Sequence, residues 1–203
     1  MNKKTKNRNT GHTLPGPALF MIVAGFLLLA PLPDALAERY LTEEQARLIG
    51  FPEADRFQSE IIELTDAQAK AVEAKTGAAV HQRKLHFQIA WKSMQFLGIY
   101  IPDDVPGKHE IIRYGAFIAA DGKLSGVEIL EYNEKYGGQI RNASWRDQFK
   151  GKSVDSPVKL NSDISSVSGA TISCRNVTDG LRRLLSEYDQ AIRPRLDALG
   201  ARP

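Results

Sequence analysis

Four consecutive stretches in the middle of the chain have an extended rather than a helical pattern of apolar positions and are rich in aromatic and β-branched residues. They lie at 84–91, 95–101, 110–120 and 123–132. Asp121 and Gly122 separate the last two stretches, and an Asp-Gly pair is a strong signal for a two-residue hairpin turn in which both positions have positive φ. The pattern therefore predicts four strands of a largely antiparallel sheet.

Two polar segments interrupt or follow the strands. Residues 102–110 (PDDVPGKHE) are rich in Pro, Gly and Asp, which predicts a surface loop. From Asn133 to Asp163 the sequence has paired glycines and no sustained period. Such a segment is typical of a functional loop region rather than of a core element.

Helical patterns precede the strands. Thr42–Gln45 and Thr65–Gln68 both have the spacing of a capping box, and Gly77 stands where the second helix would end. The residues between the two helices, 56–64 (RFQSEIIEL), predict an extended connection. Residues 38–79 therefore predict a helical extension that packs on the core of the domain.

A last helix is predicted to begin near Thr171. Its apolar residues recur at spacings of three and four and so share one face. They are Val177, Leu181, Leu184, Leu185 and Tyr188. Residues 191–203 then predict a polar tail or a short extra turn. Together the elements predict an α+β fold, in which a twisted, largely antiparallel sheet carries flanking helices and residues 80–190 form the main domain.

The first 37 residues have the layout of a secretory signal peptide. A basic start is followed by an apolar run at 18–32 and by Ala35-Leu36-Ala37, which is a cleavage pattern. The run is shorter than the roughly 20 residues of a membrane-spanning helix, which favours cleavage after Ala37. The alternative is an uncleaved N-terminal anchor. Both place Glu38 and everything after it in the periplasm or on the outer face of the cytoplasmic membrane.

Charge and cysteine content exclude several classes of protein. Without the leader, basic and acidic residues are equal in number, so the remaining chain has no basic surplus for binding nucleic acid. Cys174 is the only cysteine, which excludes an intramolecular disulfide and a cysteine metal cluster. The histidines are scattered without metal-ligand spacing, so no metal site is predicted.

The start of the last helix carries the most specific chemistry, in the stretch DISSVSGATISCRN at 163–176. Ser168-Gly169-Ala170-Thr171 places a threonine hydroxyl beside small residues at the mouth of a helix. One interpretation is a helix cap from Ser168, Thr171 or Ser173 after a turn at Gly169. The other is an anion site, because free N–H groups and the positive end of the helix dipole bind phosphate.

These residues resemble the attachment motif of the FMN-binding domain family. The resemblance rests on Ser168-Gly169-Ala170-Thr171, followed by Ile172 and Ser173 and preceded by Asp163, and it covers roughly residues 80–188. Related domains include the flavin-carrying G and C subunits of the Rnf and sodium-pumping NADH:quinone oxidoreductases. The resemblance implies that FMN is joined covalently, as a phosphoester, to Thr171.

A second stretch, from Asn133 to Lys152, is also similar to the family, with an acid, a glycine pair, an aromatic residue and Phe-x-Gly-Lys. The resemblance adds Glu134, Gly137 and Gly138 to the cofactor-binding residues. Many relatives read Glu-Thr-Pro-Gly where this chain has Glu-Lys-Tyr-Gly, so the role of Glu134 is open.

Aromatic residues in the same stretch have two interpretations. Tyr136, Trp145 and Phe149 either cover the flavin ring or form local core. Relatives often have serine where this chain has Cys174, which is interpreted as a small helix residue near the core.

The resemblance also implies partners and a function. A magnesium-dependent flavin transferase would take FMN from FAD and place it on Thr171, with Asp163 contributing to recognition. The plainest function is an exported flavoprotein that relays electrons between membrane or exported oxidoreductases, the flavin supplying the redox chemistry. The alternatives are an exported FMN-dependent reductase with its own small-molecule or metal acceptor, and a noncatalytic regulatory module. No residue is predicted to be catalytic.

Overall fold

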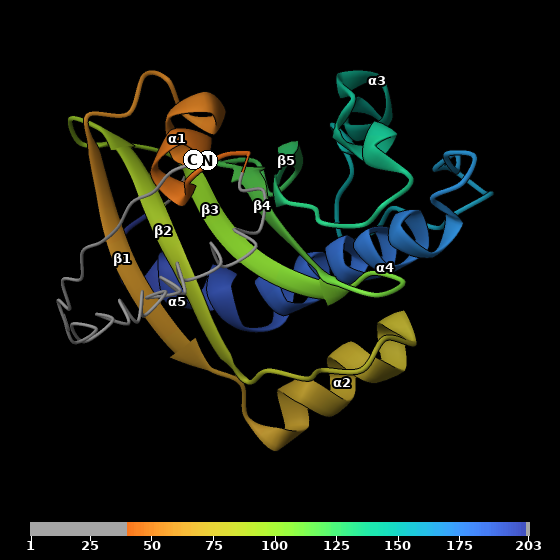
Figure 1. Ribbon diagram of the computed structural model, residues 1–203. Coiled ribbons are helices and arrows are strands. Elements are labelled where there is room, and N and C mark those ends of the chain that lie inside the picture. The colour runs from red at the N-terminus through yellow and green to blue at the C-terminus, as the bar shows by residue number, and fades with distance from the viewer. Residues whose placement is uncertain (1–39, 202–203) are drawn as a thin grey trace, which may run out of the picture. The chain divides into compact units, whose positions relative to one another are not determined.

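The computed structural model describes residues 40–201, so the predicted leader at 1–37 lies outside the described residues. Within this range, five antiparallel strands form one sheet in chain order (Figure 1). The strands are β1 (Arg56–Glu63), β2 (Lys84–Lys92), β3 (Gln95–Pro106), β4 (Ile111–Ala119) and β5 (Leu124–Glu131). The predicted α+β class, with an antiparallel sheet and flanking helices, is confirmed.

The connection at 56–64 is a strand of the same sheet, and all four predicted strands are present as well. β1 pairs with β2 along its whole length, from Arg56 opposite Trp91 to Glu63 opposite Lys84. The expectation of a sheet limited to the strands between Lys84 and Tyr132 is therefore wrong. No residue of this edge strand is fully buried, and Ile61 is exposed while Glu60 is half-buried, so its burial does not follow simple apolar alternation.

β3 runs into the predicted surface loop at 102–110, of which only residues 107–110 form the turn to β4. Pro102 and Pro106 are strand residues paired with β4. Beyond Tyr100, β3 pairs with β4 alone. Proline is tolerated in a strand with such an open side, because its missing N–H can face away from the ladder.

The predicted hairpin between β4 and β5 forms at Asp121 and Gly122, but only Gly122 has a positive φ, of +79°. The Ala119 N–H donates to the Lys123 carbonyl at 2.8 Å, and the Gly122 N–H donates to the Ala119 carbonyl at 2.9 Å. The connection is thus three residues long. A loop of this length needs positive φ only at its last position, so the expected two-residue turn is wrong.

Helix ends follow the predicted capping chemistry. Both capping boxes are confirmed, and a left-handed Gly77 with φ of +69° ends the second helix. The helices are α1 (Glu43–Gly50), α2 (Asp66–Thr76), α3 (Ala143–Arg146), α4 (Thr171–Glu187) and α5 (Arg193–Ala198), with 3₁₀ turns at Gly138–Arg141 and Asp147–Phe149 and a π-helical turn at Tyr188–Ile192. The C-terminal residues therefore form the short extra turn. Among the described helices, none is long and apolar enough to cross a membrane.

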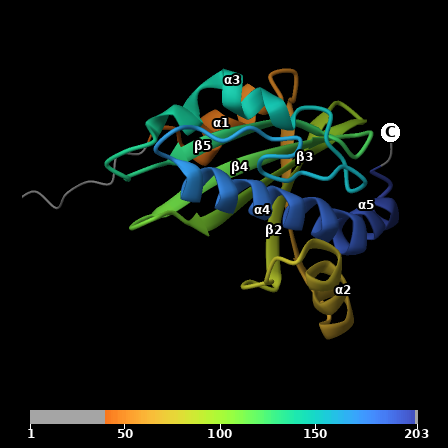
Figure 2. The ribbon, with the colours of Figure 1, turned by 90° about the vertical axis from the view of Figure 1, so that its right-hand side faces the viewer.

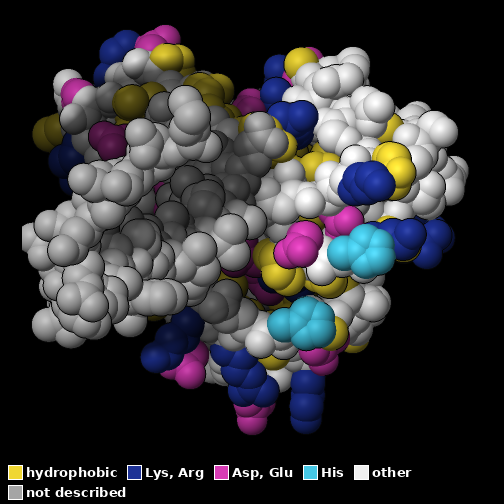
Figure 3. Space-filling view, viewed as in Figure 1, with side chains coloured by type: hydrophobic (Ala, Val, Ile, Leu, Met, Phe, Trp, Pro, Cys, Tyr) yellow, Lys and Arg dark blue, Asp and Glu magenta, His cyan; other side chains and the backbone are white. Residues whose placement is uncertain are grey.

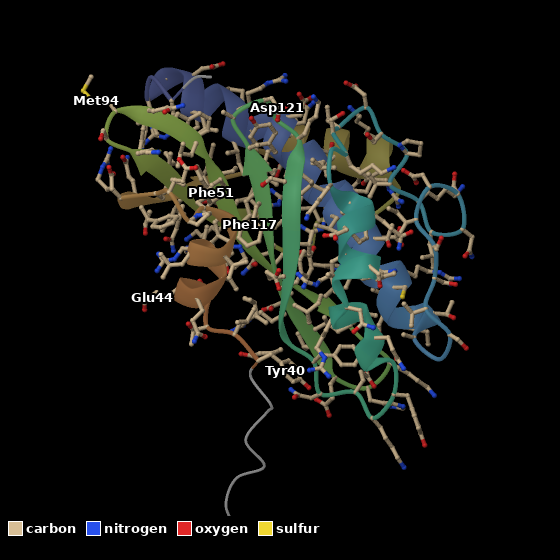
Figure 4. The ribbon with its side chains drawn as sticks, turned by 90° about the horizontal axis from the view of Figure 1, so that it is seen from above. Tyr40, Glu44, Phe51, Met94, Phe117 and Asp121 are labelled. Carbon is tan, nitrogen blue, oxygen red and sulfur yellow. The ribbon has the colours of Figure 1, made fainter. Side chains whose placement is uncertain are left out.

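The sheet separates two apolar layers (Figure 2). α4 covers one face and α2 packs against α4, whereas α1 covers the other face. Under α1, the rings of Phe51 and Phe117 meet edge to face with centroids 6.0 Å apart. Both side chains are labelled in Figure 4. α4 is tied to the end of β3 because the Asn176 side-chain amide donates to the Pro106 carbonyl at 2.6 Å. This packing brings the β3–β4 turn next to the start of α4.

Candidate functional site

α4 begins at Thr171, and its N-terminus has no side-chain cap. Ala170 occupies the N-cap position, and no side chain accepts a hydrogen bond there. The interpretation that Ser168, Thr171 or Ser173 caps the helix is therefore wrong. Gly169, with φ of +78°, turns the chain into the helix. A helix start without a side-chain cap leaves backbone N–H groups for an anion, so the local geometry fits a phosphate.

The exposed Thr171 side chain lines a cavity of about 400 Å³, a size within the roughly 300–1,000 Å³ of small-molecule sites. Three segments far apart in sequence form its walls: the β3–β4 turn, the loop after β5 and the start of α4. The lining residues are Lys108, His109, Glu134, Lys135, Tyr136, Gly169, Ala170, Thr171, Ile172 and Ser173. The cavity therefore combines a volume suited to a small molecule such as FMN with a helix N-terminus suited to its phosphate.

Tyr132 ties the loop after β5 to the start of α4. Its hydroxyl donates to the Tyr136 carbonyl at 2.6 Å and lies 3.3 Å from the Ser173 hydroxyl. Burial raises the pKa of this phenol, so it stays protonated and able to donate. Gly137 lets the same loop approach the helix, because a Cβ at this position would stand 2.4 Å from the Ala170 Cβ.

Gly137→Ala is expected to lower stability and flavin incorporation together. Gly137 has φ of +85°, and a left-handed conformation costs a non-glycine residue about 1–2 kcal/mol before the contact with Ala170 is counted. Gly151→Ala is the matched control, since Gly151 has φ of +78° and no atom near its missing Cβ. Urea unfolding should show the larger loss for Gly137→Ala. Equal losses would mean that the close approach does not matter.

Glu134 lines the cavity and also binds the β3–β4 turn. Its carboxylate accepts the backbone N–H groups of His109 at 2.6 Å and Glu110 at 3.1 Å. Burial opposes ionisation, but these N–H donors outweigh it and lower the pKa of Glu134. The contacts of Glu134 thus join the loop after β5 to the β3–β4 turn.

Asp163 is not among the residues that line the cavity. Its side chain instead joins residues of the loop that precedes the motif. Its carboxylate accepts the Lys152 ammonium at 2.8 Å and the backbone N–H groups of Val158 at 3.2 Å and Lys159 at 2.7 Å. Burial opposes ionisation, yet Lys152 and the Lys159 N–H outweigh it and lower the pKa of Asp163. Recognition of Asp163 by a transferase stays a prediction.

Asp163→Asn is expected to remove a pH-dependent part of the stability. Because the folded-state pKa is lowered, the ionised carboxylate stabilises the fold above its unfolded pKa of about 4, and this stabilisation is lost as the pH falls through the folded-state pKa. Hydrogen bonds to a charged group contribute about 1.5–3 kcal/mol. Urea unfolding should show the full difference between wild type and variant at neutral pH and a progressively smaller difference as the pH falls below about 4. A difference that stays constant over this range contradicts the assignment.

The aromatic candidates divide into two groups. Tyr136 is 69% exposed and lines the cavity, so it remains a candidate ring contact. Trp145 and Phe149 are buried core residues whose rings pack edge to face at 5.1 Å, so ring coverage is wrong for both. They are buried because their short helical turns pack against β5. The Trp145 indole N–H also donates to the Ser165 carbonyl at 2.9 Å, which holds the segment before the motif.

Other predicted residues are placed as follows. Gly169, Ala170, Ile172 and Ser173 line the cavity with Thr171, whereas Ser168 and Gly138 do not. Cys174 is fully buried beneath the motif, as a small core residue should be, and burial raises the pKa of its thiol.

Lys108, His109 and Lys135 line the cavity but were not identified from the sequence. Figure 3 shows histidine and Lys or Arg side chains gathered in the region where the β3–β4 turn lies in Figure 1. The available signal was the basic pair inside the Gly-Lys-His-Glu turn at 107–110. Only the fold shows that this turn meets a motif more than sixty residues later.

Comparison with known proteins bears on the family resemblance and on the fold. Residues 107–186 match the model of the FMN-binding domain family. No curated protein sequence matches the chain. The crystal structure of Shewanella oneidensis NqrC is similar, with a TM-score of 0.50 and 15% identity over 74% of this chain and 87% of that chain, which supports the fold. The predicted resemblance is confirmed, because residues 107–186 match the FMN-binding domain family.

Proposed function

We propose that this chain is an exported electron carrier that holds FMN covalently, as a phosphoester on Thr171. The observation that carries the proposal is the exposed Thr171 side chain at the uncapped N-terminus of α4, inside a cavity of about 400 Å³. The helix start offers N–H groups to the phosphate, and no side-chain cap competes for them. Thr171 is thus a modification site rather than a catalytic residue.

Attachment requires a partner, a magnesium-dependent flavin transferase with FAD as the FMN donor. In this step the Thr171 hydroxyl oxygen forms a bond to the phosphorus of the FMN half, the phosphoanhydride bond of FAD breaks, and AMP leaves while the hydroxyl proton is released. The exposure of Thr171 and Ile172 leaves this first helical turn accessible to such an enzyme.

Covalent attachment suits an exported protein. A noncovalent flavin bound with a micromolar Kd gains about 8 kcal/mol at the molar standard state, yet it dissociates in dilute surroundings. The leader at 1–37 directs export in this proposal, and a phosphoester keeps the cofactor on the chain afterwards. Bound FMN supplies transfer of one or two electrons, while the protein sets its position and surroundings.

The edge of the cavity supports electron relay to a protein partner. Tyr136 and Ile172 are large apolar residues, 69% and 44% exposed, and both line the cavity that contains Thr171. Exposed apolar residues beside a cofactor site provide contact area for another protein. A membrane or exported oxidoreductase that docks here would reach the flavin at close range.

Electron relay is tested with holoprotein made by co-expression with a flavin transferase. Dithionite under anaerobic conditions should bleach the flavin absorbance, and a one-electron acceptor such as ferricyanide should restore it. Without another protein, we expect no sustained turnover of NADH with quinones or ferric chelates. Sustained turnover would support the reductase alternative, and a chain that never acquires flavin would support the regulatory one.

Export is tested on the same material by fractionation and N-terminal sequencing. A periplasmic chain that begins at Glu38 is expected, and a membrane-bound chain that keeps its first residues would identify the uncleaved anchor. A full-length chain in the cytoplasm contradicts export.

A further inference from the structure

Glu134 holds the β3–β4 turn from the side of the cavity. One oxygen of its carboxylate accepts two consecutive backbone N–H groups, those of His109 and Glu110. The turn itself closes through the Gly107 N–H, which donates to the Glu110 carbonyl at 2.7 Å. A Cβ at Gly107 would lie 2.4 Å from the same carboxylate oxygen, so the absence of a side chain there lets Glu134 approach.

The turn is held from two sides. Asn176 of α4 binds the Pro106 carbonyl at its start, and Glu134 binds the next residues along the chain. Glu134 in turn belongs to the loop that Tyr132 fastens to the start of α4 through Tyr136 and Ser173. The three walls of the cavity are therefore connected by side-chain hydrogen bonds, and Glu134 makes the connection between the turn and the loop after β5.

We propose that Glu134 is a positioning residue of the flavin site, which fixes the β3–β4 turn so that Lys108 and His109 form one wall of the cavity beside Thr171. The proposal rests on the proposed function, because it assigns these side chains to a bound flavin. The residues that match the FMN-binding domain begin at Gly107, so the turn lies within the matched domain.

The two side chains on the turn are suited to this position. Lysine donates hydrogen bonds through its ammonium group, and histidine offers a ring N–H, so both can bind the carbonyl oxygens or the phosphate of FMN. Both side chains are exposed, and the backbone that carries them is held by Glu134 through the N–H groups of His109 and Glu110. Glu134 acts on the flavin through this backbone.

The first test uses the chain without flavin and measures amide hydrogen exchange in the turn. Glu134→Ala should speed exchange at His109 and Glu110 by about tenfold or more, since it removes hydrogen bonds to a charged acceptor. Glu134→Gln should stay close to wild type, because its amide oxygen still accepts both N–H groups. Glu110→Ala is the matched control, an exposed acid on the same turn whose side chain is not the acceptor.

The second test uses flavinylated protein and measures quenching of flavin fluorescence by iodide. Quenching should increase in Glu134→Ala and not in Glu134→Gln, because a freed turn no longer shields the flavin. Should the alanine variant fail to fold, Glu134→Asp replaces it, since it keeps the charge but shortens the reach by one methylene group.

The two tests separate this proposal from the attachment proposal. Unchanged exchange in Glu134→Ala overturns the positioning role whether or not flavin is attached, and so does a glutamine variant that behaves like alanine. Faster exchange with unchanged quenching overturns the assignment of the turn as a flavin wall. Wild-type protein that never acquires flavin contradicts the attachment proposal instead, and the exchange result still decides whether Glu134 holds the turn.

Discussion

Thr171→Ala is expected to leave the chain folded and without covalent flavin. The side chain is exposed and makes no cap for α4, so its removal costs the fold little, whereas the phosphoester has no other attachment atom at this position. The measurement is in-gel flavin fluorescence after denaturation of protein co-expressed with a flavin transferase. Wild type should fluoresce and the variant should be dark.

Ser168→Ala is the matched control for this result. Ser168 carries a hydroxyl in the same motif and is also exposed, but it does not line the cavity. It should keep its fluorescence. A fluorescent Thr171→Ala band would place the attachment elsewhere, and a dark wild-type band beside an active transferase would remove the covalent claim altogether.

Arg183→Met is expected to give the largest loss of stability. Arg183 lies in α4 between two acids, 2.6 Å from Asp103 on β3 and 2.9 Å from Glu187. The Tyr114 hydroxyl also donates to Asp103. Glu187 is completely buried, so removal of the guanidinium leaves an unpaired charge in the core. Breaking a buried ion pair in this way costs about 3–5 kcal/mol.

Urea unfolding of the chain without flavin measures this loss. Lys92→Ala is the control, because its pair with Glu53 is exposed at both ends and such pairs contribute about 1 kcal/mol or less. A loss for Arg183→Met no larger than that of the control would show that the buried cluster does not hold α4 against the sheet.

Local sequence signals predicted most of the elements because their causes are local. The capping boxes at Thr42 and Thr65 and the start of α4 at Thr171 depend on residues a few positions apart. β1 was not predicted as part of the sheet, because an edge strand is stabilised by its pairing with β2 more than by its own pattern. The continuation of β3 through Pro102 likewise depends on which neighbour it pairs with.

The site was only partly predictable for the same reason. Thr171 and its neighbours form a contiguous motif, and the structure brings them to one cavity with Glu134. Trp145 and Phe149 have the composition of ring contacts, but their burial against β5 is decided by tertiary packing. Lys108 and His109 reach the cavity only because Asn176 and Glu134 hold the turn beside α4.

The most direct test of the account is the site of flavin attachment, determined by peptide mass spectrometry on the exported, flavinylated chain. The account predicts a mass increase equal to FMN less one water on the peptide that contains Ser168-Gly169-Ala170-Thr171, with fragmentation placing it on Thr171. A chain whose flavin is released on denaturation, or whose added mass lies on any other residue, would contradict it.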